Sequence, residues 1–302
     1  MLSLRTTQHL GREQFALGLS VPATTALGGL LFQSGGFVIV LCMGVGFYFL
    51  AWSFAIWRLW NFEEELANKR VNNKMSLTEL VHPSHIFDTV KVIFKPRTNF
   101  KRFFLLVLFF VFLSDEFHDQ GEVVHEFLFT KRFFSWRVSD FSWFKTVDSL
   151  STSVGTVVLL PLLHYFKATD NIIILITLVS VISSNMIRGL STVYSTFYFS
   201  IMVDFPNGML AAPVRGQMSR CVDPSELGKA LSMLDSLQSL MPVLATNTYT
   251  RVYTSTRNLD YPLPGSCYFV SCFALALAAA AIIVMSFRLK CGHVPLEQGG
   301  RD

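Results

Sequence analysis

The sequence has little charge. Only 15% of its 302 residues are Asp, Glu, Lys or Arg, whereas 51% are hydrophobic and 29 are Phe. Soluble domains carry about 25% charged residues, so this composition excludes an ordinary soluble protein. We interpret the chain as an integral membrane protein built from spans of roughly 20 residues each. The net charge of +4 bears on orientation in the membrane and does not point to nucleic acid.

Cysteine patterns and catalytic motifs are also missing. The five cysteines show no paired or metal-like spacing, and no Asn-x-Ser/Thr sequence marks a glycosylated loop. There is no nucleotide-binding glycine loop, no nucleophile elbow and no sign of a cleaved signal peptide. These absences predict a protein that is not an enzyme and has no cofactor. A metal site at His118 and His125 with nearby acids is an alternative that would need these ligands on one cavity wall.

Two spans open the chain. The stretch 14–57 contains no formally charged side chain, which is too long for one crossing and suits two. Gln33-Ser34-Gly35-Gly36 is the expected turn between them, and Pro22 is expected to kink the first helix. The polar segment 61–102 follows and contains eight Lys and Arg residues. By the positive-inside rule it is predicted to be a cytosolic loop.

Six further spans are expected after this loop. The first runs from Phe103 to about Glu122, and the others are expected at 149–166, 171–187, 189–214, 229–248 and 265–287. Outer loops are expected between Glu122 and Ser149 and at 249–264, and Arg188 is expected at the outer membrane edge. The span 189–214 is interrupted by Asp204-Phe205-Pro206-Asn207-Gly208, a charge and two helix breakers. The predicted fold class is all-α, a polytopic membrane protein with eight transmembrane helices. Its expected parts are an amino-terminal pair 1–60, the loop 61–102, a six-helix bundle 103–290 and a cytosolic tail 291–302.

Protonatable side chains gather where the third expected helix leaves its apolar run. Because positions three and four apart share a helix face, one stripe contains Asp115, His118, Asp119, Glu122, His125 and Glu126. Ionisable side chains at membrane depth must face a water-filled cavity, a partner or solvent. We interpret His118 and Asp119 as the centre of a proton or cation site. His125 and Glu126 are expected in the loop beyond, and the alternative is a solvated helix end after Glu122.

Further candidates lie outside this stripe. Arg215 is at the inner end of its span, where a cation either binds an anion or anchors the helix end. Asp204 and Asp235 are acids within spans, so each faces the transport path or pairs with a base such as Arg188. His164 lies near an inner helix end and is interpreted as an interfacial residue.

Three sequence patterns together resemble solute carrier family 46 of the major facilitator superfamily, which includes proton-coupled folate transporter-like proteins. The most specific is Pro213-Val-Arg-Gly-Gln-Met-Ser-Arg-Cys-Val-Asp-Pro-Ser-Glu-Leu-Gly-Lys-Ala-Leu-Ser232. The others are the acidic helix followed by Trp136, and Leu27-Gly28-Gly29 to Gly35-Gly36-Phe37. The resemblance covers roughly residues 12 to 288. It implies two helical bundles, a functional histidine within one residue of His118, and Arg215 at a family arginine.

The chain departs from this family in two ways. The resemblance implies twelve spans, of which the sequence aligns with the fifth to the twelfth, so the first four would be missing. Many members also carry a carboxylate near the place of Leu17 or Gly18, where this chain has none. Both departures bear on whether proton coupling can be carried over to this chain.

These patterns predict a secondary transporter in the plasma membrane or an endolysosomal membrane that moves a small organic anion, folate-like or conjugated, with protons. The expected partners are the lipid bilayer, the anion and protons, with no nucleic acid. The pathway residues are predicted to be Asp115, His118, Asp119, Glu122, Asp204, Arg215 and Asp235. The alternative is a truncated, non-transporting membrane protein or an assembly partner.

Overall fold

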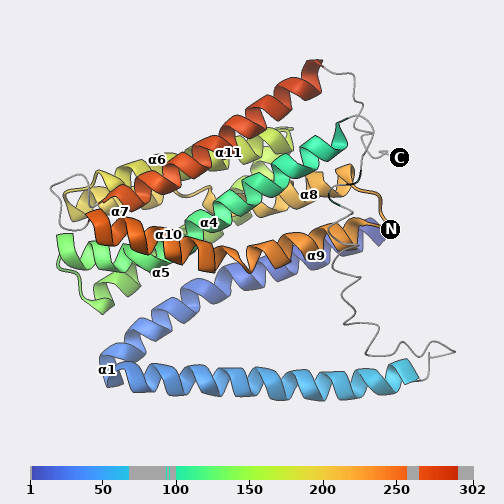
Figure 1. The fold of residues 1–302 in the computed structure, drawn as a ribbon. Coiled ribbons are helices and arrows are strands. Elements are labelled where there is room, and N and C mark those ends of the chain that lie inside the picture. Colours follow the sequence, from blue (N-terminus) through green and yellow to red (C-terminus); the bar gives the residue numbers. More distant parts are fainter. Residues whose placement is uncertain (1, 68–92, 94, 96–99, 257–264, 292–302) are drawn as a thin grey trace.

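Every regular element among the described residues is a helix, so the predicted all-α class is confirmed for this part of the chain. The computed structural model describes residues 2–67, 93, 95, 100–256 and 265–291. Figure 1 shows a bundle of α4 to α11 with a long hairpin, α1, along one side. The elements are α1 (Leu2–Ala67), α4 (Lys101–Phe133), α5 (Val138–Tyr165), α6 (Asp170–Gly189), α7 (Tyr194–Val203), η1 (Asn207–Met209), α8 (Ala211–Cys221), α9 (Leu227–Gln238), α10 (Met241–Thr256) and α11 (Ser266–Cys291).

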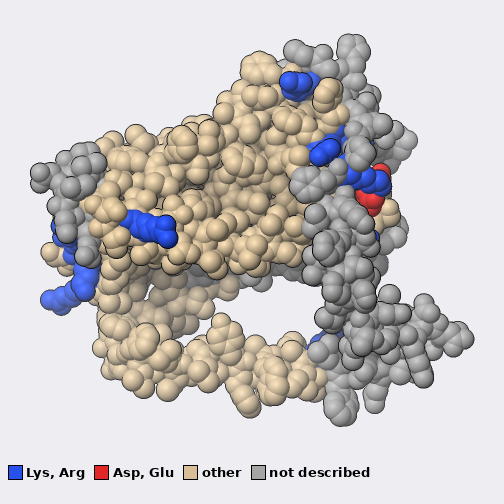
Figure 2. All heavy atoms as spheres, viewed as in Figure 1, with Lys and Arg blue, Asp and Glu red and all other residues tan. Residues whose placement is uncertain are grey.

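The element α1 is a hairpin of two arms. Gly36 has φ 68° and ψ −164°, a left-handed conformation that favours glycine, and Gly35 before it is also non-helical. The predicted turn at Gln33–Gly36 is therefore confirmed. The first arm, residues 2–34, packs against α5, and the second arm, residues 37–67, bends away from the bundle. Figure 2 shows open space between the second arm and the bundle.

Four helical segments are long and apolar enough to cross a membrane. Among the described residues they are Pro22–Arg58, Val138–Tyr165, Asp170–Gly189 and Ser266–Arg288. The expected count of eight spans is not supported, and the sequence explains why. The hairpin counts once, α4 has only the short apolar run Phe103–Leu113 before its charges begin, and two expected spans are divided into shorter helices.

The expected spans 189–214 and 229–248 are each interrupted. The first is divided into α7, η1 and α8, so the predicted break at Asp204–Gly208 is confirmed. The second is divided into α9 and α10, and α10 continues through residues that were predicted to form a loop. The predicted segment 61–102 lies largely outside the described residues, as do residues 292–302 of the predicted tail.

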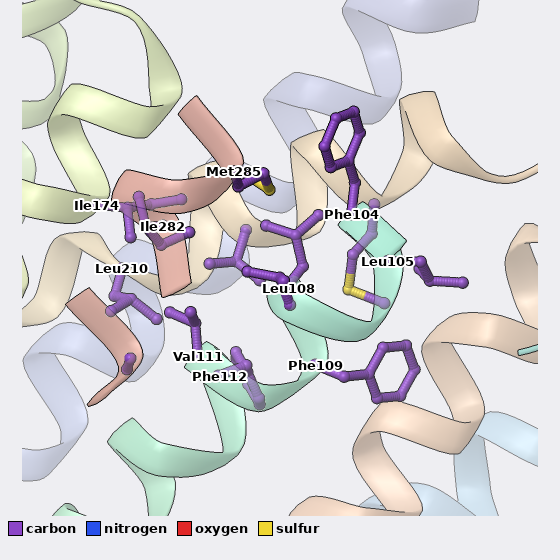
Figure 3. Packing of buried hydrophobic residues seen from close by; sticks show 14 of the residues in the cluster. Phe104, Leu105, Leu108, Phe109, Val111, Phe112, Ile174, Leu210, Ile282 and Met285 are labelled. Atoms are coloured by element: carbon purple, nitrogen blue, oxygen red, sulfur yellow. The ribbon is translucent and has the colours of Figure 1, made fainter. Parts of the chain in front are cut away.

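The apolar core lies at one end of the bundle, where α4 meets α6, α8 and α11. Figure 3 shows Leu108, Val111, Ile174, Leu210 and Ile282 from four different segments packed together. Large apolar side chains also cover the outside of the helices, and Figure 2 shows Lys and Arg mainly toward the two ends of the visible face. An apolar belt between charged ends is what a lipid bilayer requires. Together with the membrane-capable helices, this pattern supports an integral membrane protein.

The break after α7 is held by its neighbours. The hydroxyl of Ser180 in α6 donates a hydrogen bond to the carbonyl oxygen of Val203, the last residue of α7. On the other side, α5 approaches so closely that a Cβ atom at Gly155 would overlap the carbonyl oxygen of Phe205. The interruption is therefore a packed part of the fold, and it places Asp204 in the interior of the bundle, 2% exposed.

Candidate functional site: a buried charge cluster

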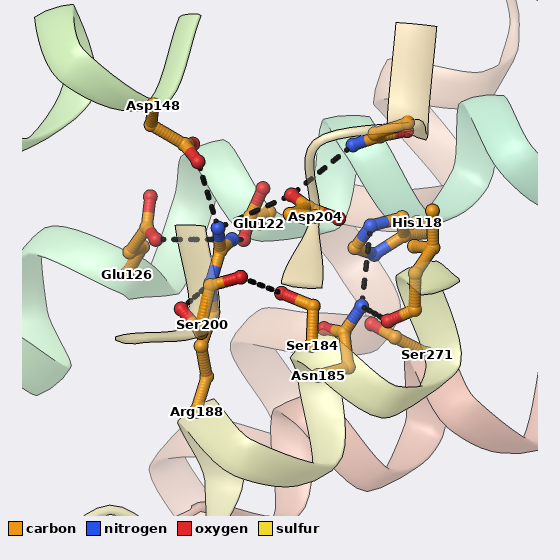
Figure 4. Close-up of polar contacts among 12 residues, drawn as sticks. His118, Glu122, Glu126, Asp148, Ser184, Asn185, Arg188, Ser200, Asp204 and Ser271 are labelled. Carbon is orange, nitrogen blue, oxygen red and sulfur yellow. Dashed lines mark hydrogen bonds and ion pairs between the residues drawn. The ribbon is translucent and has the colours of Figure 1, made fainter. Parts of the chain in front are cut away.

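Arg188 is the centre of a cluster of charged side chains inside the bundle. It lies near the end of α6, yet its side chain is only 1% exposed. Its Nη2 atom lies 2.9 Å from Asp148 Oδ1 of α5 and 3.2 Å from Asp204 Oδ2. Its Nη1 atom donates to Glu122 of α4, and Nε donates to Ser200 Oγ of α7 at 2.9 Å. Figure 4 shows the guanidinium surrounded by these groups.

Lys145 is a second cation in the same cluster. Its Nζ atom lies 2.9 Å from Glu126 Oε2, 3.2 Å from Asp148 Oδ2 and 3.7 Å from Glu122 Oε2. Glu126 is fully buried and its other oxygen, Oε1, lies 3.5 Å from Arg188 Nη1. Lys145 and Arg188 therefore share three carboxylates between them.

We define the charge cluster as Glu122, Glu126, Lys145, Asp148, Arg188 and Asp204. Its negative and positive charges are not equal in number. Four carboxylates face two cations, so full ionisation leaves two negative charges without a counter-charge. Buried charges are costly unless they are paired and hydrogen-bonded. Oδ1 of Asp204 has no hydrogen-bond partner in the part of the chain that the structure describes. The arrangement is therefore suited to bind a proton or another cation.

His118 lies beside the charge cluster on α4. It is 1% exposed, and its Nε2 atom lies 3.4 Å from the side-chain amide nitrogen of Asn185 on α6. Its other ring nitrogen has no hydrogen-bond partner among the described residues. Glu122, one helical turn further, belongs to the cluster itself. The structure thus brings three of the predicted pathway residues, His118, Glu122 and Asp204, into one interior region.

His125 and Glu126 lie inside α4, and the expectation that they belong to an outer loop was wrong. The helix continues to Phe133, because this stretch faces the aromatic residues and cations of neighbouring helices. The ring of His125 stacks on Tyr249 with centroids 5.4 Å apart and meets the edge of Tyr268 at 4.7 Å. Its Nδ1 atom is 2.7 Å from the carbonyl oxygen of Gly121.

The remaining predicted residues lie at the margin of this region or outside it. Asp119 is half exposed, and its carboxylate is 3.8 Å from His118 Nε2. Asp115 is partly buried, and its Oδ1 atom has no hydrogen-bond partner among the residues described. Arg215 and Asp235 pair with each other at 3.0 Å across α8 and α9, with side chains 37% and 57% exposed. They form a surface pair separate from the charge cluster.

Sequence reasoning missed Lys145 and Asp148, and it placed Arg188 at the outer edge. Residues 138–148 were assigned to an outer loop and the next helix was expected to begin at Ser149, whereas α5 begins at Val138. A usable signal was present, because Phe141, Phe144, Lys145 and Asp148 recur at helical spacing. His164, interpreted as interfacial, is exposed. The described residues contain no group of three or more side chains placed to hold a metal ion.

Comparison with known proteins gives a distant match to a transporter. No protein-family model matches the chain. A Drosophila melanogaster protein, "Probable peptidoglycan muropeptide transporter SLC46", is 27% identical over 170 residues, which is 55% of this chain. The chain spans about a third of the length of that relative, since the match covers 33% of it. The name of that relative describes a transporter and not an enzyme. The apolar helices support an integral membrane protein, and the sequence is distantly similar to a probable SLC46 transporter.

Proposed function

We propose that this chain is a secondary transporter, or the ion-coupling part of one, and that it moves a small organic anion together with protons. The observation that carries the proposal is the charge cluster, in which four buried carboxylates, the buried Arg188 and the partly exposed Lys145 come together from α4, α5, α6 and the end of α7. Ionisable groups inside a membrane protein are costly and usually serve an ion or substrate path.

The imbalance of the charge cluster explains how it would respond to protons. Lys145 is within 4 Å of three carboxylates, so a proton taken up by one of them leaves the lysine to pair with the other two. Lys145 belongs to α5, so protonation of Glu122 or Glu126 weakens its link to α4 and leaves its contact with Asp148 of the same helix. A difference of one pH unit supplies about 1.4 kcal/mol per proton for such a change. Rearrangement between helices is the basis of alternating access.

We infer the substrate class from the proteins that this chain resembles. The name of the Drosophila relative makes a peptidoglycan muropeptide the first solute to test. The resemblance to proton-coupled folate transporter-like proteins makes a folate the second. Both carry carboxylates, so both belong to the predicted class of small organic anions.

A second candidate function is that of a non-transporting membrane protein or assembly partner. The observation that favours it is the second arm of α1, where the apolar helix 37–58 has almost every side chain exposed. A two-bundle transport path needs helices on both sides of the cavity. Under this alternative, the charge cluster has a structural role only and holds α4, α5, α6 and α7 together.

Uptake into proteoliposomes distinguishes the two functions. The purified chain is reconstituted alone, and uptake of labelled muropeptide or folate is measured at external pH 5.5 and 7.5 with the interior at pH 7.5. Transport predicts uptake that rises as the external pH falls and that moves protons into the vesicles, measured with an enclosed pH dye. Uptake no greater than in empty vesicles, with folded protein present, would overturn transport by this chain.

Two variants test whether the charge cluster carries the coupling. Glu126→Gln and Asp204→Asn keep the shape of each side chain and remove one titratable group. We expect both to uncouple uptake from the pH gradient. Asp223→Asn is the matched control, because Asp223 is exposed in the segment between α8 and α9 and lies outside the cluster. Equal pH dependence in the three variants would contradict a coupling role.

A further inference from the structure

A cavity with polar and aromatic walls lies where the tip of the α1 hairpin meets the junction of α4 and α5. Its volume is about 740 Å³, and it shares no lining residue with the charge cluster. Pockets that bind small molecules commonly measure roughly 300–1,000 Å³. The cavity is lined by Phe32 and Gln33 of α1, Phe127 and Lys131 of α4, and the consecutive residues Ser135, Trp136, Arg137, Val138 and Ser139.

The charged residues that line this cavity are both cations. Lys131 and Arg137 line it, and no carboxylate is among the lining residues that the structure describes. The nearby carboxylate of Asp140 accepts a hydrogen bond at 2.9 Å from the backbone N–H of Arg137, at the start of α5. Lys131 lies over the ring of Phe127, 6.0 Å from its centroid. The cavity thus offers an ammonium and a guanidinium, together with hydroxyl groups of Ser135 and Ser139.

Aromatic rings form the apolar walls of the cavity. Trp136 is partly buried and is held by Phe144 and Phe197, with centroid distances of 5.4 and 5.8 Å. Phe127 is held by Phe141 at 5.2 Å. Rings fixed in this way bind a flat ligand with little loss of side-chain freedom.

We propose that this cavity is a binding site for a small organic anion that combines a flat ring with a carboxylate, phosphate or sulfonate group. The ring lies against Trp136 and Phe127, and the anionic group pairs with Arg137 and Lys131. Guanidinium groups bind such oxyanions through two parallel hydrogen bonds, which fixes the orientation of the ligand. The inference does not depend on transport, because it concerns binding at a site that no part of the charge cluster lines.

Binding of 2-naphthoate tests the proposal. The full chain is placed in nanodiscs of phosphatidylcholine, and binding is followed by quenching of tryptophan fluorescence and by calorimetry. We expect saturable binding of 2-naphthoate and at least about fivefold weaker binding of neutral 2-naphthalenemethanol and of ring-free acetate. Equal binding of the naphthoate and the alcohol would overturn the anion site.

Variants locate the site within the chain. Arg137→Gln with Lys131→Gln is expected to weaken 2-naphthoate binding about tenfold, since two charge-assisted contacts are lost. Arg132→Gln is the matched control, because Arg132 is exposed beside Lys131 but does not line the cavity. Lys131→Arg keeps the charge and is expected to keep the affinity. A loss in the control equal to that in the double variant would contradict the assignment.

The lipid composition separates a ring-bearing solute from an anionic headgroup. In nanodiscs containing phosphatidylglycerol, a solute site keeps its affinity for 2-naphthoate within about twofold. The Arg132→Gln control measures how much the negatively charged membrane surface repels the naphthoate in general, and the comparison is made after this contribution is removed. A different outcome would assign the cavity to lipid headgroups and overturn the proposal. In that outcome phosphatidylglycerol reduces 2-naphthoate binding to the native protein but not to the double variant of Lys131 and Arg137.

Discussion

The second arm of α1 and the bundle α4–α11 use apolar residues in opposite ways. In the second arm, large side chains such as Phe47, Phe49 and Trp52 are exposed, and none of the residues 37–58 is buried. In the bundle, helices of similar hydropathy bury one face, and polar residues such as Arg188 and Ser200 lie in the interior. Apolar composition alone therefore predicts a membrane environment but not a packed helix.

The difference teaches that polar residues specify packing in this protein. The second arm has no acidic or basic residue from Phe37 to Trp57, so nothing fixes which of its faces meets another helix. In α4, charges and small residues mark one side. At Gly121, a Cβ atom would overlap the ring of Tyr249, so α10 approaches closely there. Small residues permit such approach, and buried polar groups direct it.

The largest expected effect comes from removing the central cation of the bundle. Arg188→Met leaves Glu122, Asp148 and Asp204 without their guanidinium partner. Breaking a buried ion pair on one side costs about 3–5 kcal/mol, so we expect a large fall in Tm in detergent. Arg215→Met is the control, because its pair with Asp235 is largely exposed and is worth below about 1 kcal/mol. Similar losses in both variants would contradict the burial of the cluster.

A smaller effect is expected from deleting one ring in each region. Phe144 is fully buried beneath Trp136 and Phe197, whereas Phe49 in the second arm is 64% exposed. We expect Phe144→Ala to cost about 3 kcal/mol, at the lower end of the ~3–5 kcal/mol found in soluble cores, because detergent solvates the Phe144 ring once the protein is unfolded. Phe49→Ala is expected to change stability by less than about 0.5 kcal/mol. Chemical unfolding of the two variants measures the contrast, and a large loss for Phe49→Ala would show that the arm is covered.

The smallest effect concerns two glycines inside helices. Gly155→Ala places a methyl group against the backbone of Phe205, and overpacking of this kind costs about 1–3 kcal/mol. Gly46→Ala, in the second arm, meets nothing within 4 Å and should raise stability by up to about 1 kcal/mol through helix propensity. Thermal unfolding checks the sign of each change. Two changes of the same sign would mean that the regions do not differ in packing.

Local features of the fold could be predicted from the sequence, because a residue or two determine them. The turn at Gly35–Gly36 and the interruption at Asp204–Gly208 both follow from helix breakers in apolar surroundings. Helix ends were predicted less well. Charged residues between Glu122 and Ser149 were taken as loop, because hydropathy cannot distinguish a polar helix face turned inward from a solvated segment.

The composition of the charge cluster could not be predicted, because its members come from separate helices. His118, Glu122 and Asp204 were identified as acids or imidazoles within spans, but their common partner Arg188 was placed at the membrane edge. The pairing of Arg215 with Asp235 depends on how α8 packs beside α9. Such contacts are tertiary, and no spacing along the sequence contains them.

The serine residues of α6 link its unfolding to that of α7. Ser180 and Ser184 donate hydrogen bonds to the carbonyl oxygens of Val203 and Ser200, in the last turn of α7. The last turn of α7 cannot open without breaking the hydrogen bonds that these two serine side chains of α6 donate to it. Backbone amides near Ser200 should therefore exchange with deuterium in the same cooperative event as those near Ser184.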